Sequence, residues 1–355
     1  MKRLHLNRLL LFTFAVVGMM KQTAFALITI DTVPVGNAGN VTDDGTYYGQ
    51  GAVGYDYGIG KYEVTLNQYT AFLNAVAKTD PYGLYNLAMV TDVKVRGISR
   101  GGVAGSYTYS VIGNGNRPVT YVSWFDAARF VNWLHNGQPI GAQSAGTTES
   151  GAYTLNGAVS GIVTRNANWI YGLPTEDEWV KAAYYQPAAQ GGDVDNYWLY
   201  PTASNVMPNS RNGSGSDANS GNFFRNDGIA NGFNGGFAVS QSTTYPPVGN
   251  VLTAVGAFSS ADSFYGTFDQ GGNVMEWNDL VNEGVNGAAS GRGIRGGAWE
   301  YEAQAMSTPF GGQNVPESEF NVVGFRIVVV PEPSAVAFTG LGATLLVWAR
   351  RKSAA

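Results

Sequence analysis

The 355-residue sequence predicts a single α+β domain that is rich in irregular loops. Three observations predict this class. Apolar residues between positions 27 and 330 alternate over short stretches, as in β-strands, and Gly or Asn interrupts them every few residues. Three segments break this pattern with the spacing of amphipathic helices. Two long stretches, 137–168 and 186–242, show neither pattern and are expected to be loops.

The first two helices are predicted over residues 67–78 and 123–135. In the first, apolar residues three and four apart form one stripe along the segment: Tyr69, Phe72, Leu73 and Val76. The second begins at Ser123, a good N-cap residue, and Asp126 stands three positions later, as in a capping box. Both segments therefore present an apolar face to a core.

The third helix is predicted to begin after Thr175 and to run to about Tyr185. Thr175 and Glu178 have the spacing of a capping box, and the acidic residues of the first turn lie at the positive end of the helix dipole. This position in the first turn accounts for the presence of Glu176 and Glu178, so a catalytic role is not needed to explain them.

The loop stretch 186–242 is expected to be ordered and packed on the body. It is rich in Asn, Ser and Gly, which stabilise turns, and it carries little net charge. Aromatic residues are interleaved along it: Phe223, Phe224, Phe233 and Phe237. No break in composition separates two domains, so one domain with long loops is predicted.

Charge and cysteine content exclude several classes of protein. Seven of the 21 basic residues lie in the two ends, which leaves 14 against 26 acidic residues, a net charge of −12, over residues 27–334. A body this acidic excludes a nucleic-acid partner and is compatible with cation binding and export. The absence of Cys excludes a disulfide scaffold, a thiolate metal site, an iron–sulfur cluster and a cysteine nucleophile.

Residues 1–26 have the order of parts of a secretory signal peptide. The basic residues Lys2, Arg3 and Arg8 precede an apolar run over 9–20, and Ala24-Phe25-Ala26 supplies the small residues of a cleavage site. Cleavage is predicted after Ala26. The alternative is an uncleaved anchor, but the run is about 12 residues long, too short for a helix that spans about 30 Å of hydrocarbon.

Residues 331–355 resemble the PEP-CTERM sorting signal of exported proteins of Gram-negative bacteria. Pro331-Glu332-Pro333 is followed by an apolar stretch over 335–349 and then by Arg350-Arg351-Lys352. The resemblance implies a short transmembrane segment, transient membrane association and processing by an exosortase-type sorting protease. It also implies delivery to the outer envelope, the cell surface or the extracellular space. A short tail anchor is the alternative.

Seven groups of residues, in order over about 58–328, resemble the formylglycine-generating enzyme, or sulfatase-modifying factor, family. They are GKYEVT at 60–65, PV at 118–119 with VSWFDA at 122–127, LPTEDEW at 173–179, PVG at 247–249, GGNVMEW at 271–277, RGGAW at 295–299 and GFR at 324–326. The resemblance implies an atypical C-type-lectin-like fold over residues 27–330, with two main helices and small mixed sheets. It places Trp124, Trp179, Trp277 and Trp299 in the core.

The resemblance does not extend to the family's oxidase chemistry. The two cysteines that hold copper in those oxidases correspond to about Tyr301 and Met306, and neither side chain forms a thiolate. A related branch, the ergothioneine-type sulfoxide synthases, places iron on three His, whereas His135 is the one His between residues 27 and 330. His135 is interpreted as a cap at the end of a helix. No copper or iron is therefore expected.

The resemblance also implies a structural calcium ion. Its ligands map to the Asp269 side chain, the carbonyls of Gly272 and Val274, and the Glu276 carboxylate. Two carboxylates and two carbonyls, completed by waters, are a reasonable ligand set for Ca²⁺. The alternative is that Glu276 is a buried structural carboxylate. A second calcium site would use Asn219.

Two further groups have both a structural and a functional interpretation. Arg295 and Arg326 could bind an anion, but they are expected to pair with Glu63, Glu178 or Asp126, since a body with few cations needs them as partners. The side chains of Tyr265, Trp299 and Tyr301 could line a groove that corresponds to the peptide site of the oxidases.

Three functions are considered. The leading hypothesis is an exported, non-catalytic, calcium-stabilised module that acts as a binding or structural protein of the envelope or extracellular matrix, with a peptide or polysaccharide as ligand. The first alternative is a divergent oxidoreductase or sulfatase-modifying enzyme with a non-cysteine site. The second is a calcium-dependent carbohydrate-binding protein.

Overall fold

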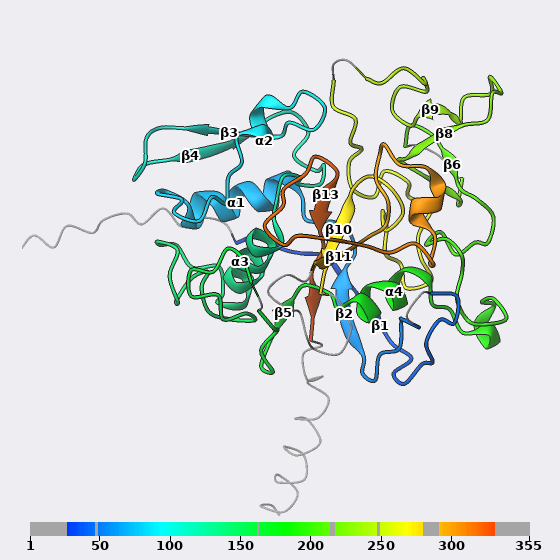
Figure 1. Ribbon diagram of the computed structural model, residues 1–355, viewed down its shortest axis with the longest axis horizontal. Coiled ribbons are helices and arrows are strands. Elements are labelled where there is room, and N and C mark those ends of the chain that lie inside the picture. The colour runs from blue at the N-terminus through cyan, green and yellow to red at the C-terminus, as the bar shows by residue number, and fades with distance from the viewer. Residues whose placement is uncertain are drawn as a thin grey trace, which may run out of the picture.

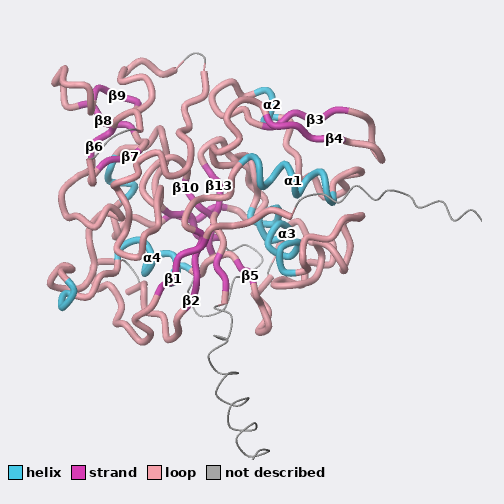
Figure 2. The backbone as a smooth tube through the Cα atoms, turned by 180° about the vertical axis from the view of Figure 1, so that it is seen from behind, coloured by secondary structure: helices cyan, strands magenta, loops and turns pink. Residues whose placement is uncertain are grey.

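The structure is a computed structural model that describes residues 27–46, 49–161, 163–213, 217–246, 249–279 and 291–330. Two small four-stranded sheets lie at its centre, and most of the remaining chain is loop (Figures 1 and 2).

The first sheet has the strand order β1-β2-β14-β5, and all of its strand pairs are antiparallel. Its strands are β1 (Thr32–Val35), β2 (Tyr57–Gly60), β14 (Val328–Val329) and β5 (Tyr171–Gly172). The sheet thus joins the first strands of the chain to the last. Ile59 lies opposite Val33 on one side and Val328 on the other, so β2 is buried along its whole length.

The second sheet has the order β12-β11-β10-β13 and is mixed, because β10 and β13 run parallel. Its strands are β10 (Met275–Asn278), β11 (Arg292–Arg295), β12 (Gly312–Asn314) and β13 (Val323–Phe325). Gly324 in β13 has a packing reason: a Cβ there would lie 2.6 Å from the carbonyl oxygen of Val119. Only glycine allows this close approach of two backbones.

The three predicted helices are present as α1 (Leu66–Val76), α3 (Trp124–His135) and α4 (Glu176–Tyr184). The predicted capping boxes of α3 and α4 are confirmed. The Ser123 amide donates to Asp126 Oδ2 at 2.9 Å, and the Thr175 amide donates to Glu178 Oε2 at 2.7 Å. Helix α1 has the same motif, in which Gln68 plays the part of the acidic residue.

Three short helical segments were not predicted. They are α2 (Ala88–Thr91) and the 3₁₀ helices Ala188–Gln190 and Ala303–Met306. Each is about one turn long, and one turn carries no measurable apolar periodicity.

Helices α1 and α3 lie together on one side of the central sheets, and α4 lies on the other side (Figure 1). Between α1, α3 and β13 the rings of Tyr69, Phe72, Phe130 and Phe325 pack edge-to-face or stacked, with centroids 5.4–6.5 Å apart. Such aromatic pairs stabilise a core beyond the area they bury. Trp124, Trp179, Trp277 and Trp299 are all buried, as predicted.

The remaining strands form three small two-stranded pairs outside the two central sheets (Figure 1). They are β3 (Ile98–Gly101) with β4 (Thr108–Val111), β6 (Asn209–Ser210) with β7 (Ser220–Gly221), and β8 (Phe224–Asn226) with β9 (Gly235–Phe237). Of the described residues in 137–168, none belongs to a helix or strand. The predicted loops are therefore present, and the second one contains only short strands and the 3₁₀ helix Ala188–Gln190.

The α+β class with few helices and small mixed sheets is confirmed. The predicted signal peptide (1–26) and the predicted sorting signal with its short transmembrane segment (331–355) lie outside the described residues. Within the part of the chain that is described, no helix has the length and apolarity needed to cross a membrane.

The buried cap of α3 predicts how stability changes with pH. Burial, with a smaller contribution from Glu319, raises the pKa of Asp126 to about 7, and hydrogen bonds from Ser123 offset only part of this rise. The folded state therefore holds this proton more tightly than the unfolded state does. Between about pH 4 and pH 7 the unfolded chain releases the proton first, so the free energy of unfolding falls as pH rises.

We expect Asp126→Asn to remove a few kcal/mol of this fall, because an amide keeps the cap acceptor but does not titrate. Urea unfolding at pH 4.5, 6 and 7.5 measures it, with the exposed Asp262→Asn as control. An identical pH dependence in wild type and Asp126→Asn would contradict the assignment.

Candidate functional site

The two residues at about the positions where the resemblance places the oxidase cysteines, Tyr301 and Met306, differ sharply in environment. Met306 ends a 3₁₀ helix, is 1% exposed and packs with Tyr200, Phe223 and Ala303. Tyr301 is 39% exposed. A buried thioether and an exposed phenol cannot bind Cu(I) as two thiolates do, so these residues build packing and surface here.

Glu276, in the GGNVMEW motif, forms a buried ion pair with Arg326 of the GFR motif. Arg326 Nε donates to Glu276 Oε2 at 2.6 Å, and a second guanidinium nitrogen donates to Oε1 at 2.7 Å. The indole N–H of Trp179, from α4, donates to Oε2 at 2.7 Å. Both side chains of the pair are 0% exposed. The Glu276 carboxylate thus accepts three hydrogen bonds and has its charge neutralised.

Arg326 also connects backbone segments that are far apart in the sequence. Its guanidinium donates to the carbonyl oxygens of Gly60, at the end of β2, and of Phe268, at 2.9 and 2.8 Å. One side chain therefore links the first sheet, the second sheet and the loop before β10, and α4 is linked to them through Trp179.

Two more carboxylates lie near this ion pair, and we call Glu63, Asp269, Glu276 and Arg326 together the Arg326 cluster. Burial and the charges of Asp269 and Glu276 raise the pKa of Glu63 well above its usual value. Burial raises the pKa of Asp269 to about 6, although the Gly256 amide and Arg326 partly offset the rise. Three buried carboxylates thus lie near one guanidinium, which is hydrogen-bonded to Glu276, and among the described residues Glu63 Oε2 has no hydrogen-bond partner.

The prediction that Arg295 and Arg326 pair with carboxylates is confirmed, but the predicted partners are wrong. Arg295 pairs with Glu176, and Arg326 pairs with Glu276, instead of with Glu63, Glu178 or Asp126. Glu178 is taken by Arg165, whose two terminal nitrogens donate to its oxygens at 2.9 and 3.0 Å. Sequence spacing could not assign these pairs, because the two members of each pair lie in different helices, strands or loops that only the fold brings together.

Of the predicted calcium ligands, Glu276 does not fit, because its oxygens already accept from Arg326 and Trp179. Asp269 fits better. It is buried, its one hydrogen-bond donor is the Gly256 amide, and it belongs to a cluster with surplus negative charge. Gly272 has φ of 93°, and a Cβ there would lie 2.4 Å from the carbonyl oxygen of Asn222, so the tight path predicted for this loop is present.

The described residues contain no group of three or more His, Cys, Asp and Glu side chains placed to hold one metal ion. The predicted calcium site is a smaller set and remains a prediction that rests on Asp269 and the carbonyls of Gly272 and Val274. Asn219, predicted for a second ion, is engaged in its loop: its side-chain oxygen accepts from Thr202 at 2.6 Å and its amide donates to Val206 at 2.8 Å.

His135 ends α3, and its Nδ1 accepts from the Ile170 amide at 3.2 Å. Burial lowers its pKa, which favours the neutral ring that can accept this bond. It therefore caps a neighbouring backbone group.

The three residues predicted for a groove lie in different surroundings. Trp299 is buried and lines an apolar pocket of about 190 Å³ with Phe237, Pro246 and Val251. Tyr265 packs instead beside the β1–β2 hairpin, where its hydroxyl donates to Asn37 Oδ1 at 2.9 Å. Tyr301 is exposed. We call the first cavity the Trp299 pocket.

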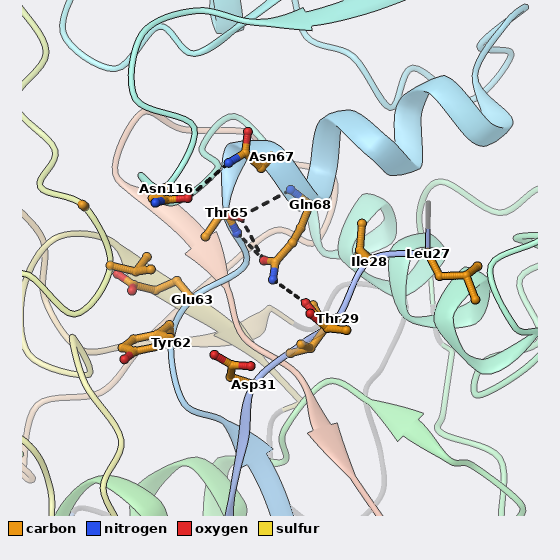
Figure 3. A pocket seen from close by; sticks show the side chains of 13 residues that line it. Leu27, Ile28, Thr29, Asp31, Tyr62, Glu63, Thr65, Asn67, Gln68 and Asn116 are labelled. Atoms are coloured by element: carbon orange, nitrogen blue, oxygen red, sulfur yellow. Dashed lines mark hydrogen bonds between the residues drawn. The ribbon is translucent and has the colours of Figure 1, made fainter. Parts of the chain in front are cut away.

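A larger cavity of about 530 Å³ lies elsewhere and was not predicted. It is lined by residues 27–31, by residues of the segment 62–68 that leads into α1, by Asn116 and by 254–255. Figure 3 shows Asp31, Tyr62 and Gln68 around the same space. We call it the N-terminal pocket. Its signal in the sequence was weak, because three of its four lining segments lie outside the motifs that carry the family resemblance.

The chain was compared with known proteins. A family model described as a sulfatase-modifying factor enzyme 1-like domain matches residues 29–330. The chain belongs to the sulfatase-modifying factor family. The search of curated proteins gave no match.

Three solved structures are similar to this sulfatase-modifying factor domain at low identity. CarF has 20% identity over 86% of this chain and 99% of its own, with a TM-score of 0.49. Treponema denticola variable protein 1 has 18% identity over 87% and 98%, with a TM-score of 0.45. PvdO from Pseudomonas aeruginosa has 16% identity over 85% and 92%, with a TM-score of 0.39.

Breaking the central ion pair should cost far more stability than breaking a surface pair. We expect Glu276→Gln to lower the free energy of unfolding by about 3–5 kcal/mol, because it removes the charge of the carboxylate that is hydrogen-bonded to the buried Arg326. The control is Asp217→Asn, which removes the partly exposed Arg211 pair at 3.9 Å and should cost less than about 1 kcal/mol.

Urea unfolding in the presence of a calcium chelator measures the free energy of unfolding of Glu276→Gln and of Asp217→Asn. If Glu276→Gln does not fold, the double variant Glu276→Met with Arg326→Met, which removes both charges, should recover folding. Equal small losses for Glu276→Gln and Asp217→Asn would contradict the role of the pair.

Calcium is tested at Asp269. We expect Ca²⁺ to raise the melting temperature of chelator-treated protein, and Asp269→Asn to abolish that rise, because the amide removes the free carboxylate charge. Asp262→Asn, an exposed change of the same charge nearby, is the control. A melting temperature that does not respond to Ca²⁺ would reject the ion.

Proposed function

We propose that this sulfatase-modifying factor domain is an exported, non-catalytic module that acts as a binding or structural protein of the envelope or extracellular matrix. The observation that carries the proposal is the pair Tyr301 and Met306 at the positions of the two oxidase cysteines, in a chain without any Cys. The chain has the fold of the family, but without Cys it lacks the thiols that the family's oxidase chemistry uses.

The environments of these residues support the proposal. Met306 belongs to a packed cluster, and its carbonyl accepts from the Tyr184 hydroxyl at 2.9 Å. A redox centre needs ligands that reach substrate and metal, whereas Met306 is 1% exposed. The iron chemistry of the related branch also lacks support, since His135 already accepts a backbone hydrogen bond.

Export is proposed from the two ends of the sequence. The order of parts in residues 1–26 is typical of a signal peptide, and residues 331–355 resemble a PEP-CTERM signal. An exosortase-type protease is the partner this implies, with transient membrane association before processing. An acidic body with few cations agrees with a place outside the cytoplasm and with the absence of a nucleic-acid partner.

A binding role is supported by the volume of one of the two pockets. The N-terminal pocket, at about 530 Å³, is within the range of small-molecule sites, about 300–1,000 Å³. The Trp299 pocket, at about 190 Å³, is below it. A peptide or polysaccharide is the proposed kind of ligand.

Enzyme assays distinguish this proposal from a divergent oxidoreductase. We expect the exported protein to consume no dioxygen with thiol-containing peptides, before or after incubation with Cu(I) or Fe(II), because no thiolate is available. A Tyr301→Cys, Met306→Cys double variant is the informative comparison, since it places a thiol at both positions. Turnover by the wild-type protein would refute the proposal.

A further inference from the structure

We propose that one end of the first sheet lies against a membrane of zwitterionic lipid while the C-terminal apolar segment is inserted in it. The surface consists of Tyr55, Trp169, Ile170, Tyr171 and Val330, and we call it the Ile170 patch. The inference rests on the proposed export and transient membrane association, and it names the face of the domain that meets the lipid.

The register of the first sheet brings the patch residues to one end of it. Strand β14 pairs with β2 on one side and with β5 on the other, and both pairs are antiparallel. Val330 follows β14, and its amide donates to the Ile170 carbonyl at 3.0 Å. The residues just before β2 and β5, which include Tyr55 and Trp169, therefore lie at the end of the sheet where β14 finishes. Figure 1 shows β1, β2 and β5 together at the lower end of the molecule.

The position of β14 inside the sheet fixes the point at which the chain leaves the body. Residues 331–355 lie outside the described part of the chain, but their number limits their reach. Five Cα–Cα steps lead from Val330 to Ala335, where the apolar stretch begins, and they span at most about 18 Å. The interfacial layer on each side of a bilayer is about 5–8 Å thick. With the apolar stretch in the hydrocarbon, the Ile170 patch is therefore held close to the headgroups.

The side chains of the patch suit this position. Tyr55 and Ile170 are each 46% exposed, Val330 is 40% exposed, and Trp169 and Tyr171 are partly buried. Trp and Tyr are enriched at membrane–water interfaces, because their rings can enter the apolar layer while their polar groups stay in water. The surface nearest to the inserted segment is thus one that an interface can cover.

The charged groups beneath the patch are paired with each other. Glu178 accepts a hydrogen bond from the Tyr55 hydroxyl at 2.6 Å and another from Arg165 at 2.9 Å. The Arg165 guanidinium lies 4.0 Å from the centre of the Trp169 ring. This ion pair connects the two flanks of the patch, and its two charges neutralise each other instead of facing the lipid.

The charge of the surroundings selects the kind of lipid. Asp56, next to Tyr55, is exposed, and residues 27–334 carry a net charge of −12. Anionic headgroups attract basic surfaces and repel an acidic one. A zwitterionic headgroup, which has no net charge, is therefore the partner that the Ile170 patch fits.

This contact has a consequence for processing. It holds Pro331, the first residue of the predicted sorting signal, at the membrane surface. A sorting protease that is itself embedded in the membrane meets its site there. The Ile170 patch is thus a surface that positions the substrate of the protease.

The test uses the full chain, exported by a host without a sorting protease so that residues 331–355 remain, in phosphatidylcholine vesicles. Because the sequence has no Cys, one introduced Cys carries one fluorescent label. Gly54→Cys places the label beside Tyr55, where a Cβ meets no atom within 4 Å. Val103→Cys is the control: Val103 is 71% exposed in the β3–β4 turn, and Figures 1 and 2 place that hairpin away from β2 and β5. With a lipid spin-labelled at its headgroup, we expect a loss of fluorescence at position 54 and none at position 103.

A second pair of variants separates contact by the patch from mere closeness. In the chain labelled at position 54, Ile170→Asp adds a charge to the patch and should abolish most of the loss of fluorescence. Val103→Asp, the same change at another exposed apolar residue, should leave the loss unchanged.

A third label distinguishes failure of the inference from failure of the proposed membrane association. Ala343→Cys places it within the apolar stretch 335–349, where a lipid spin-labelled in its acyl chains should quench it. Quenching at 343 with equal signals at 54 and 103, or with no effect of Ile170→Asp, would overturn the inference alone. A label at 343 that is not quenched would overturn the membrane association as well.

Discussion

The buried ion pair between Glu276 and Arg326 is the constraint on which the rest of the architecture depends. A guanidinium can be buried only if its donors are satisfied, and Arg326 achieves this with the Glu276 carboxylate and the carbonyls of Gly60 and Phe268. These partners belong to β10, to the end of β2 and to a loop, so the two sheets can pack only in the arrangement that brings them together. The indole N–H of Trp179 also donates to Glu276, which links α4 to the same ion pair. In a fold with short strands and long loops, one polar junction of this kind defines relative positions that the apolar core alone would leave free.

Because buried ion pairs hold the elements together, the fold can form without the family's redox residues. Met306 contributes to a hydrophobic cluster with Tyr200 and Phe223, and Tyr301 lies at the surface. Neither position is needed for the ion pairs that hold the sheets and helices. The ion pairs of the described residues therefore do not depend on the side chains at these two positions.

Local features of the fold could be predicted from the sequence, and long-range features could not. The Ser123–Asp126 and Thr175–Glu178 capping boxes are local in sequence, and both are present as predicted. Burial of the four tryptophans followed from the family motifs. The partners of Arg295 and Arg326 were assigned wrongly, because Glu176 and Glu276 reach them only through strand pairing and helix packing over 50 to 119 residues of sequence. The N-terminal pocket was missed for the same reason: Asp31, Glu63 and Asn116 have no common pattern, and only the fold brings them to one cavity.

The most direct measurement is a crystal structure of the exported protein with its metals identified by anomalous scattering at the copper, iron and calcium wavelengths. The account predicts that Glu276 is bound to Arg326 and Trp179, and that no anomalous peak for copper or iron lies beside Tyr301, Met306 or His135. A transition-metal peak at full occupancy with any of these residues as ligand would contradict it, because the scaffold would then still carry a redox centre.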